Sequence, residues 1–216
     1  MTPTSRRSNR PAGIVLAGGY SRRFGPADKS LARLDGTPLV RHVIDRLGTV
    51  TEIVVVSCRA DQRPGFERTL DGTSTEIRYA IDPVADQGPV VGVLTALDCI
   101  ERPFVAVVAC DMPFVDPDFL EFLFETAADR DGAVPTDDEG IAQPAQAVYR
   151  AKALEAAGRA AVAEGQPRLQ RLLDRLDVAL MDRSDLEYEP DPEGFINVNT
   201  PAELQALERR VARRSR

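Results

Sequence analysis

The chain has 216 residues, of which 43% are hydrophobic and 28% charged. This composition is typical of an ordinary globular domain with a sizeable core, and the length leaves little room for a second full domain. The formal net charge of −7 disfavours an extended nucleic-acid surface, and no apolar run is long enough to span a membrane. We therefore expect a cytoplasmic protein that binds neither nucleic acid nor membrane.

The rarer residue types narrow the chemistry. Cys58, Cys99 and Cys110 show no C-x-x-C spacing, which indicates neither a disulfide framework nor a zinc site and suits a reducing cytosol. His42 is the only histidine, and its place in a helical pattern favours a structural role. Mechanisms of the Ser-His-Asp or Cys-His kind are therefore disfavoured.

In the first half of the chain, strands alternate with helices. Apolar runs predict strands over residues 12–17, 52–57, 77–82 and 104–110. Helices are expected over residues 37–48, within 61–75, over 89–100 and after the cap at Asp116. The first of these helices is expected to begin at Thr37-Pro38 and to end at Gly48. This alternation predicts an α/β fold with helices on both faces of a mostly parallel sheet.

The second half has a different pattern. Strands are expected over residues 132–135, 143–149 and 178–181, and helices over 152–164 and 168–176. The last helix is expected to begin at Thr200-Pro201, with Glu203 at capping-box spacing, and to run into an arginine-rich end.

The stretch from Leu16 to Lys29 directly follows the first predicted strand. Gly18 and Gly19 let the backbone turn sharply and approach a ligand closely, and cations follow them within a dozen residues. This arrangement is typical of a phosphate cradle. A plain turn with solvated arginines explains the same residues, and the stretch matches neither the P-loop nor G-x-G-x-x-G, so this motif alone leaves both interpretations open.

Lys29 itself is unusual in this chain. The positive charge is nearly all arginine, and Lys29 and Lys152 are the only lysines. A compact ammonium is not replaced by arginine at every phosphate site. Lys29 is therefore a candidate functional residue.

Polar side chains stand at the ends of the other predicted strands of the first half. Ser57, Asp82 and Asp111 occupy places equivalent to that of the glycine pair. In an open parallel sheet, ligands bind beyond the carboxyl ends of the strands. For Asp82 two interpretations stay open: a hydrogen bond from a nucleoside base or ribose, or a bond from local backbone amides.

Asp111 has the clearest functional signal. It follows an apolar strand and precedes Met112-Pro113, which prevents helical continuation. Mg²⁺ binds through one or two carboxylates together with substrate phosphates, so Asp111 is a candidate metal ligand, with a simple turn cap as the alternative. Asn197 and Asn199 precede the last helix, and one of them is a candidate neutral oxygen ligand. Asn199 or Thr200 is equally well explained as an ordinary helix cap.

Taken in order, these motifs resemble a known family. The quoted set is Leu16-Ala17-Gly18-Gly19-x-Ser21-x-Arg23-Phe24-Gly25 with Asp28-Lys29, Gly88-Pro89-x-x-Gly92, Cys110-Asp111-x-Pro113 and Asn197-Val198-Asn199-Thr200-Pro201. It resembles the molybdenum cofactor guanylyltransferases, which join GMP from GTP to molybdopterin, and the resemblance extends over residues 12–207. The first motif alone marks the wider nucleotidyltransferase superfamily.

The resemblance implies a fold and a division of the chain. The fold would be a Rossmann-like three-layer αβα arrangement with a mostly parallel central sheet, of the nucleotide-diphospho-sugar transferase type. A flexible tail at residues 1–11 would precede one domain over residues 12–208, and an arginine-rich tail at 209–216 would follow it. Within the domain, residues 12–130 would bind the nucleotide and residues 131–208 the acceptor.

The resemblance also implies a site. The nucleotide contacts carried over are Leu16, Ala17, Gly18, Gly19, Lys29, Asp82 and Asp111. Asp111 would also bind Mg²⁺, with Asn199 as a second ligand, and the pterin side would lie around Gln143-Pro144 and Arg168. An asparagine of the family after the second strand is missing here, where the chain reads Ser57-Cys58-Arg59.

The implied reaction is nucleotidyl transfer. A phosphate oxygen of molybdopterin would attack the α-phosphorus of GTP, and pyrophosphate would leave. A phosphate monoester has a second pKa of about 6, so the nucleophile needs no general base, which fits the scarcity of histidine. Catalysis would rest on positioning and on charge neutralisation by Mg²⁺, Arg23 and Lys29, with Asp111 holding the metal ion.

Three other readings stay open on the sequence. A sister enzyme would act on cobinamide phosphate, phospholactate, a sugar phosphate or a cytosine-dinucleotide cofactor. A non-catalytic carrier of the cofactor would keep the fold without turnover. For the guanylyltransferase itself, the expected partners are GTP and molybdopterin, together with molybdoenzymes or other cofactor-biosynthesis proteins. The arginine-rich end would mark an RNA contact only if salt-dependent affinity were measured.

Overall fold

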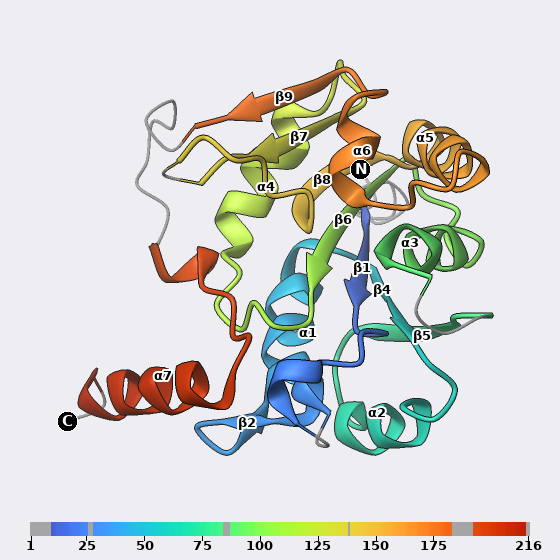
Figure 1. The fold of residues 1–216 in the computed structure, drawn as a ribbon. Helices are drawn as coiled ribbons and strands as arrows, with labels where there is room; N and C mark the ends of the chain where they lie inside the picture. Colours follow the sequence, from blue (N-terminus) through green and yellow to red (C-terminus); the bar gives the residue numbers. More distant parts are fainter. Residues whose placement is uncertain (1–9, 26–27, 84–86, 138, 183–191, 215–216) are drawn as a thin grey trace, which may run out of the picture.

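A computed structural model of the protein describes residues 10–25, 28–83, 87–137, 139–182 and 192–214 (Figure 1). Residues 1–9 of the expected N-terminal tail and the last two residues of the expected C-terminal tail lie outside the described part. Every helix within the described ranges is too short or too polar to cross a bilayer.

A sheet of seven strands runs through the centre of the described chain, in the order β5-β4-β1-β6-β8-β7-β9. The strands are β1 (Ala12–Leu16), β4 (Ile53–Cys58), β5 (Glu76–Ile81), β6 (Phe104–Ala109), β7 (Gly132–Pro135), β8 (Gln146–Arg150) and β9 (Val178–Met181). β5, β4, β1 and β6 are mutually parallel, while β8 is antiparallel to β6 and to β7. The expected α/β fold with a mostly parallel sheet is confirmed.

Helices cover both faces of this sheet. The helices are α1 (Leu39–Val50), α2 (Arg63–Leu70), α3 (Pro89–Leu97), α4 (Pro117–Thr126), α5 (Ala151–Ala163), α6 (Leu169–Leu173) and α7 (Pro201–Arg214). Apolar side chains of α1, α2 and α4 form one core layer with the sheet, and those of α3, α5 and α6 form the other. Because buried strands are apolar on both faces, the central strands read as the continuous apolar runs seen in the sequence.

The expected start and end of the first helix are wrong. Thr37–Pro38 forms β3, which pairs with β2 (Arg33–Leu34) in a small hairpin, so α1 begins only at Leu39. Asp35 and Gly36 both have positive φ at the hairpin turn, and this Asp-Gly pair was the available signal. His42 Nε2 lies 2.9 Å from the Leu34 carbonyl oxygen, so the histidine has the structural role expected of it.

Gly48 lies inside α1 rather than at its end. The helix continues for two residues to Val50, and Thr51 follows it with a hydroxyl that donates to the Leu47 carbonyl. A Cβ at Gly48 would overlap the hydroxyl of Thr75. The glycine therefore serves close packing and does not stop the helix.

The second half continues the same sheet. β8 begins at Gln146, three residues later than expected, because the chain turns at Gln143 and the Gln146 amide donates to the Gln143 carbonyl. In the antiparallel pair, Gln146 lies opposite Val108 near the end of β6. The turn before β8 is therefore brought to the edge of the sheet where β1, β4, β5 and β6 end.

α7 lies beside the β2–β3 hairpin (Figure 1). Thr200 and Glu203 form the expected capping box: the Thr200 hydroxyl accepts from the Glu203 amide, and the Glu203 carboxylate accepts from the Thr200 amide. The expected arginine-rich tail overlaps this helix, and its Arg210 and Arg214 each pair with the buried carboxylate of Glu193.

Candidate functional site

The carboxyl ends of four parallel strands bring the predicted polar residues to one edge of the sheet. Leu16 pairs with Ser57 on one side and with Ala109 on the other, and Cys58 pairs with Ile81. The glycine pair, Asp82 and Asp111 therefore follow neighbouring strands, and Ser57 lies near the end of β4 at the same edge. The expected gathering of these features at one rim is confirmed.

Lys29 and Asp111 form an ion pair, although 82 residues separate them in the sequence. Lys29 Nζ lies 2.5 Å from Asp111 Oδ2, and the two side chains are only 14% and 12% exposed. Asn199 Oδ1 lies 3.4 Å from the same ammonium. The Val198 amide donates to the Asp111 carbonyl at 2.9 Å, which fixes Asn199 beside the end of β6.

The second carboxylate oxygen of Asp111 is available to a cation. Asp111 Oδ1 is buried and has no hydrogen-bond partner among the described residues, an arrangement that costs free energy unless another group binds there. With Asn199 Oδ1 nearby, the donor set is all oxygen, which suits Mg²⁺. The described residues hold no cluster of three or more His, Cys, Asp or Glu side chains able to bind a metal ion. A cation at Asp111 would therefore take its remaining ligands from substrate phosphates and water.

Asp82 and Ser57 form a second polar pair, with Ser57 on the strand next to that of the glycines and Asp82 at the end of the strand beyond it. The Ser57 hydroxyl donates to Asp82 Oδ1 at 3.1 Å. A Cβ at Gly18 would overlap Asp82 Oδ2, and a Cβ at Gly92 would overlap the Ser57 hydroxyl. Glycine at these two positions therefore makes room for the pair.

Burial raises the pKa of the Asp82 carboxyl above its ordinary value, against the opposing effects of the Ser57 hydroxyl and the Arg59 charge. Burial also raises the pKa of the Cys58 thiol to about 12, with the Asp82 charge adding to the effect. The pKa of Cys110 is raised too, again mainly by burial. These thiols stay protonated at neutral pH, and the three cysteines are free, so nothing here favours a thiolate nucleophile.

Two cavities adjoin at this rim. The first has a volume of about 410 Å³, and its lining includes Gly18, Ser57, Asp82 and Gly88. The second has a volume of about 530 Å³ and is lined by residues of the second half and of the segment before α7, namely Gln143, Pro144, Gln146, Arg168, Gln170 and Asn197 among others.

The two cavities meet at shared walls. Pro89, Ala145 and Leu169 line both of them. Ala109 lines the first cavity and Met112 lines the second, so Asp111 stands between two wall residues in the chain. Lys29 and Asp111 themselves line neither of these two cavities.

Not every predicted residue joins this arrangement. Leu16 and Gly19 line the first cavity, and Ala17 is buried beneath it. Arg23 lies exposed on a short 3₁₀ helix, η3 (Arg22–Phe24), and within the described ranges its side chain forms no hydrogen bond or ion pair with Lys29 or Asp111. The structure therefore brings Lys29, Asp111 and Asn199 together and leaves Arg23 apart.

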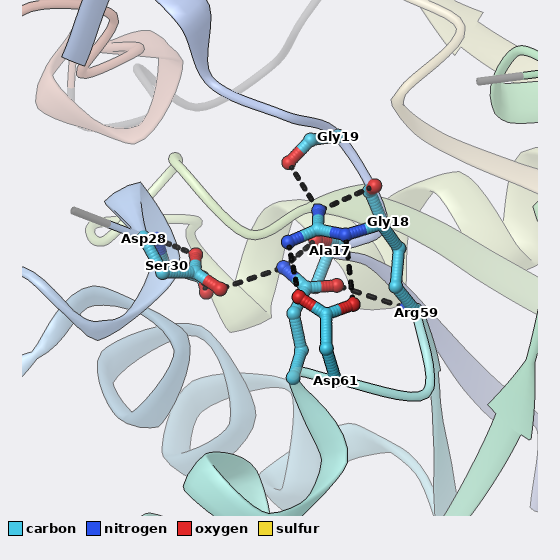
Figure 2. A network of polar contacts seen from close by, with 8 residues as sticks. Ala17, Gly18, Gly19, Asp28, Ser30, Arg59 and Asp61 are labelled. Carbon is cyan, nitrogen blue, oxygen red and sulfur yellow. Dashed lines mark hydrogen bonds and ion pairs between the residues drawn. The ribbon is translucent and has the colours of Figure 1, made fainter. Parts of the chain in front are cut away.

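Sequence reasoning missed the residues that support the glycines. Arg59 and Gln62, in the loop between β4 and α2, donate hydrogen bonds to carbonyl groups of residues 17–19 (Figure 2). We call residues 17–20 the glycine loop. No local pattern in the sequence marks Arg59 or Gln62, because their partners lie about 40 residues away.

Comparisons with known proteins agree with this architecture. The family model described as "MobA-like NTP transferase domain" matches residues 13–180. A protein of Natronomonas pharaonis named "Probable molybdenum cofactor guanylyltransferase" is 38% identical over 93% of this chain and 98% of its own. A protein of the same name from Haloferax mediterranei is 35% identical over 92% of this chain and 93% of its own.

A solved structure is also similar. The molybdopterin-guanine dinucleotide biosynthesis protein A of Archaeoglobus fulgidus is 26% identical, with a TM-score of 0.73 over 94% of this chain and 99% of its own. This likeness confirms the expected fold type, and the family model covers well over half of the chain. The chain therefore belongs to the family of MobA-like nucleotidyltransferases.

Proposed function

We propose that this protein transfers GMP from GTP to molybdopterin, with release of pyrophosphate and formation of molybdopterin guanine dinucleotide. The observation that carries the proposal is the pair of cavities with shared walls, between whose wall residues Ala109 and Met112 the ion-paired Asp111 stands in the chain. A transferase that joins two substrates needs such neighbouring sites. The names of the relatives supply the identity of the two substrates.

The first cavity is the proposed site of the nucleoside. Asp82 and Ser57 supply a carboxylate and a hydroxyl in a largely apolar surrounding, where hydrogen bonds to a base are strong. A carboxylate accepts hydrogen bonds from neighbouring N–H groups of a base such as guanine. The glycine loop then supplies backbone amides to the triphosphate.

The second cavity is the proposed site of molybdopterin. Gln143 and Gln146 offer amide groups to a pterin ring, and Arg168 offers a positive charge to the phosphate of the acceptor. The domain division expected from the sequence fits this picture, since residues 12–130 and 131–208 each supply most of one cavity.

The reaction is a substitution at phosphorus. An oxygen of the molybdopterin phosphate attacks the α-phosphorus of GTP, a new P–O bond forms, and pyrophosphate leaves with the electron pair of the broken bond. The nucleophile is already largely ionised at neutral pH, so no side chain has to remove a proton. Lys29 stabilises the charge that develops on the phosphate oxygens, whereas Arg23 would contribute only if its exposed side chain turned towards the triphosphate.

Mg²⁺ is the proposed cofactor, and the residues present fit it. Asp111 would hold the ion through its unpartnered Oδ1, with Asn199 Oδ1 as a neutral ligand. Bound Mg²⁺ neutralises negative charge on phosphate oxygens. Lys29 keeps the other oxygen of Asp111 in place, which fixes the orientation of the carboxylate.

The experiment that tests this function is a turnover assay. The protein is incubated with molybdopterin and each nucleoside triphosphate in turn, with and without Mg²⁺, and pyrophosphate is measured. We expect pyrophosphate release from the reaction that contains molybdopterin, GTP and Mg²⁺, and none with another nucleoside triphosphate or without Mg²⁺. Preference for CTP or for another phosphorylated acceptor would assign the protein to a sister activity, and GTP binding without turnover would assign it a carrier role.

A further inference from the structure

Arg59 contacts the glycine loop at two successive peptide groups. Its Nη1 donates to the Gly18 carbonyl at 2.9 Å and to the Gly19 carbonyl at 3.0 Å (Figure 2). Arg59 stands in the segment after the second strand of the chain's nucleotide half, where the resemblance led us to expect an asparagine. This segment therefore differs from the expected pattern, and the structure shows what its arginine contacts.

The guanidinium of Arg59 is itself held from two other sides. Its Nε and Nη2 donate to the two carboxylate oxygens of Asp61 at 3.1 and 3.2 Å, and its centre lies 4.4 Å from the ring centroid of Tyr20. The side chain is only 12% exposed. A planar group that is paired on one edge and stacked on one face has little freedom left to turn.

Gln62 extends the same contact by one residue. Its Nε2 donates to the Ala17 carbonyl at 2.9 Å, and its Oε1 accepts from the Arg59 amide at 2.9 Å. Gln62 is buried. Three successive carbonyls, those of Ala17, Gly18 and Gly19, therefore point towards the loop between β4 and α2.

The direction of the carbonyls determines the direction of the amides. In a planar trans peptide, the N–H of one residue points opposite to the C=O of the residue before it. The amides of Gly18, Gly19 and Tyr20 therefore point away from Arg59. Within the described part of the chain, these three amides donate no hydrogen bond. A run of free amides on one side is an anion-binding arrangement.

We propose that Arg59 is a positioning residue that holds the glycine loop with its amides directed at the triphosphate of the nucleotide. The inference rests on the proposed function in so far as the nucleotide is GTP. Arg59 acts through the loop and touches no reacting atom. Because Arg59 orders the loop beforehand, nucleotide binding loses less conformational entropy of the glycine-rich backbone, which is the most flexible kind.

Arginine is suited to this task in a way that lysine is not. The fork of a guanidinium reaches two carbonyls and a carboxylate at once in one plane, whereas an ammonium is a single point charge. We therefore expect Arg59→Lys to restore only part of what Arg59→Ala loses. Arg63→Ala is the matched control, because Arg63 begins α2 four residues later. Among the described residues, its ion pair is with Glu67 and its ring contact with Tyr79, not with the glycine loop.

The first readout is kinetic. If the free loop adopts the binding conformation about a tenth of the time, the apparent affinity for GTP falls about tenfold. Arg59→Ala should therefore raise the KM for GTP on the order of tenfold, with kcat and the KM for molybdopterin changed by less than about threefold. Arg63→Ala should keep the wild-type values, and millimolar methylguanidinium should restore part of the affinity of Arg59→Ala.

The second readout needs no substrate. Relaxation of the ¹⁵N amides of Gly18 and Gly19 is measured in the nucleotide-free protein, where order parameters near 0.85 mark a rigid backbone and values below about 0.6 a flexible one. We expect rigid amides in the wild type and in Arg63→Ala, and flexible ones in Arg59→Ala.

The two readouts distinguish the positioning role of Arg59 from the proposed GMP transfer. Unchanged loop order parameters in Arg59→Ala overturn the inference. If the wild type is active in the GTP assay, a KM for GTP in Arg59→Ala equal to that of the wild type overturns it as well. Rigid wild-type amides that become flexible in Arg59→Ala support the positioning role even in a protein that fails the GTP assay, and that failure counts against the proposed function alone.

Discussion

Lys29 Nζ lies 2.5 Å from Asp111 Oδ2, and this ion pair joins the segment after the glycine loop to the end of β6. Each partner offsets the desolvation of the other, because an unpaired charge in this nearly buried place would be strongly destabilising. The pair also leaves Asp111 Oδ1 unpartnered. One contact thus fixes both side chains, and in the proposed mechanism it orients the carboxylate for a cation and the ammonium for the phosphates.

Replacement of Lys29 should slow turnover far more than it weakens folding. Lys29→Ala removes a preorganised charge at the developing phosphate charge, which typically costs about 10²- to 10³-fold in kcat. Lys152→Ala is the matched control, because Lys152 is the other lysine of the chain and lies exposed on α5. Steady-state kinetics and thermal unfolding of both variants test this. Full turnover by Lys29→Ala would remove Lys29 from the mechanism.

Asp82→Asn should weaken GTP binding by about 10- to 100-fold, because a hydrogen bond to a charged group contributes about 1.5–3 kcal/mol. The variant keeps an oxygen that accepts from Ser57. Titration calorimetry with GTP measures the loss, and an affinity equal to that of the wild type would show that Asp82 does not contact the nucleotide.

The same variant should not lower stability at neutral pH. Burial raises the pKa of Asp82 in the folded state above 3.8, so between the unfolded and folded values the folded protein binds more protons. The contribution of Asp82 to stability therefore falls as pH rises through that window and is lowest above it. We expect the free energy of unfolding of Asp82→Asn to equal or exceed the wild-type value at pH 7. Denaturant unfolding of both proteins at pH 7 and at acid pH tests this expectation. An Asp82→Asn variant that is less stable than the wild type only at neutral pH would contradict it.

Gly18→Ala should act through Asp82. The added methyl group would overlap Asp82 Oδ2, whereas a methyl group at Gly19 would meet no atom within 4 Å. Overpacking costs about 1–3 kcal/mol, and each kcal/mol lowers the Tm of a chain of this size by about 2–4 °C. Gly18→Ala should therefore melt below Gly19→Ala in calorimetry. Its effect on GTP affinity should be less than additive with that of Asp82→Asn, and strict additivity would mean that the two positions act independently.

Arg168→Ala should raise the KM for molybdopterin and leave the KM for GTP unchanged. Arg168 lines only the second cavity, where a charged hydrogen bond to the acceptor phosphate would contribute about 1.5–3 kcal/mol, or about 10- to 100-fold. Arg171 lies one turn further along α6 and pairs with Asp174, so Arg171→Ala is the matched control. Steady-state kinetics with each substrate varied in turn measure both KM values. A rise in the KM for GTP instead of that for molybdopterin would reverse the assignment of the cavities.

The central strands were predictable from sequence because burial on both faces leaves a continuous apolar run, as in β4 and β6. Their shared rim followed from the parallel order. The β2–β3 hairpin was missed because two strands of two residues show no periodicity, and Thr37-Pro38 has the composition of a helix start.

The contacts within the site were harder to predict. The polar character of Asp82 and Ser57 was visible in the sequence, but their hydrogen bond exists because β4 and β5 are neighbours in the sheet. The role of Arg59 depends on a loop that meets residues about 40 positions earlier. Such pairings depend on tertiary structure, which local patterns do not contain.

The most direct measurement of the central claim follows the phosphorus atoms of GTP. GTP labelled at the α-phosphate or at the γ-phosphate is incubated with the protein, Mg²⁺ and molybdopterin, and the products are separated. Nucleotidyl transfer predicts that the α-label enters molybdopterin guanine dinucleotide and that the γ-label leaves in pyrophosphate, in equal amounts. Transfer of the γ-label to the acceptor, or no α-label in the dinucleotide, would contradict the account.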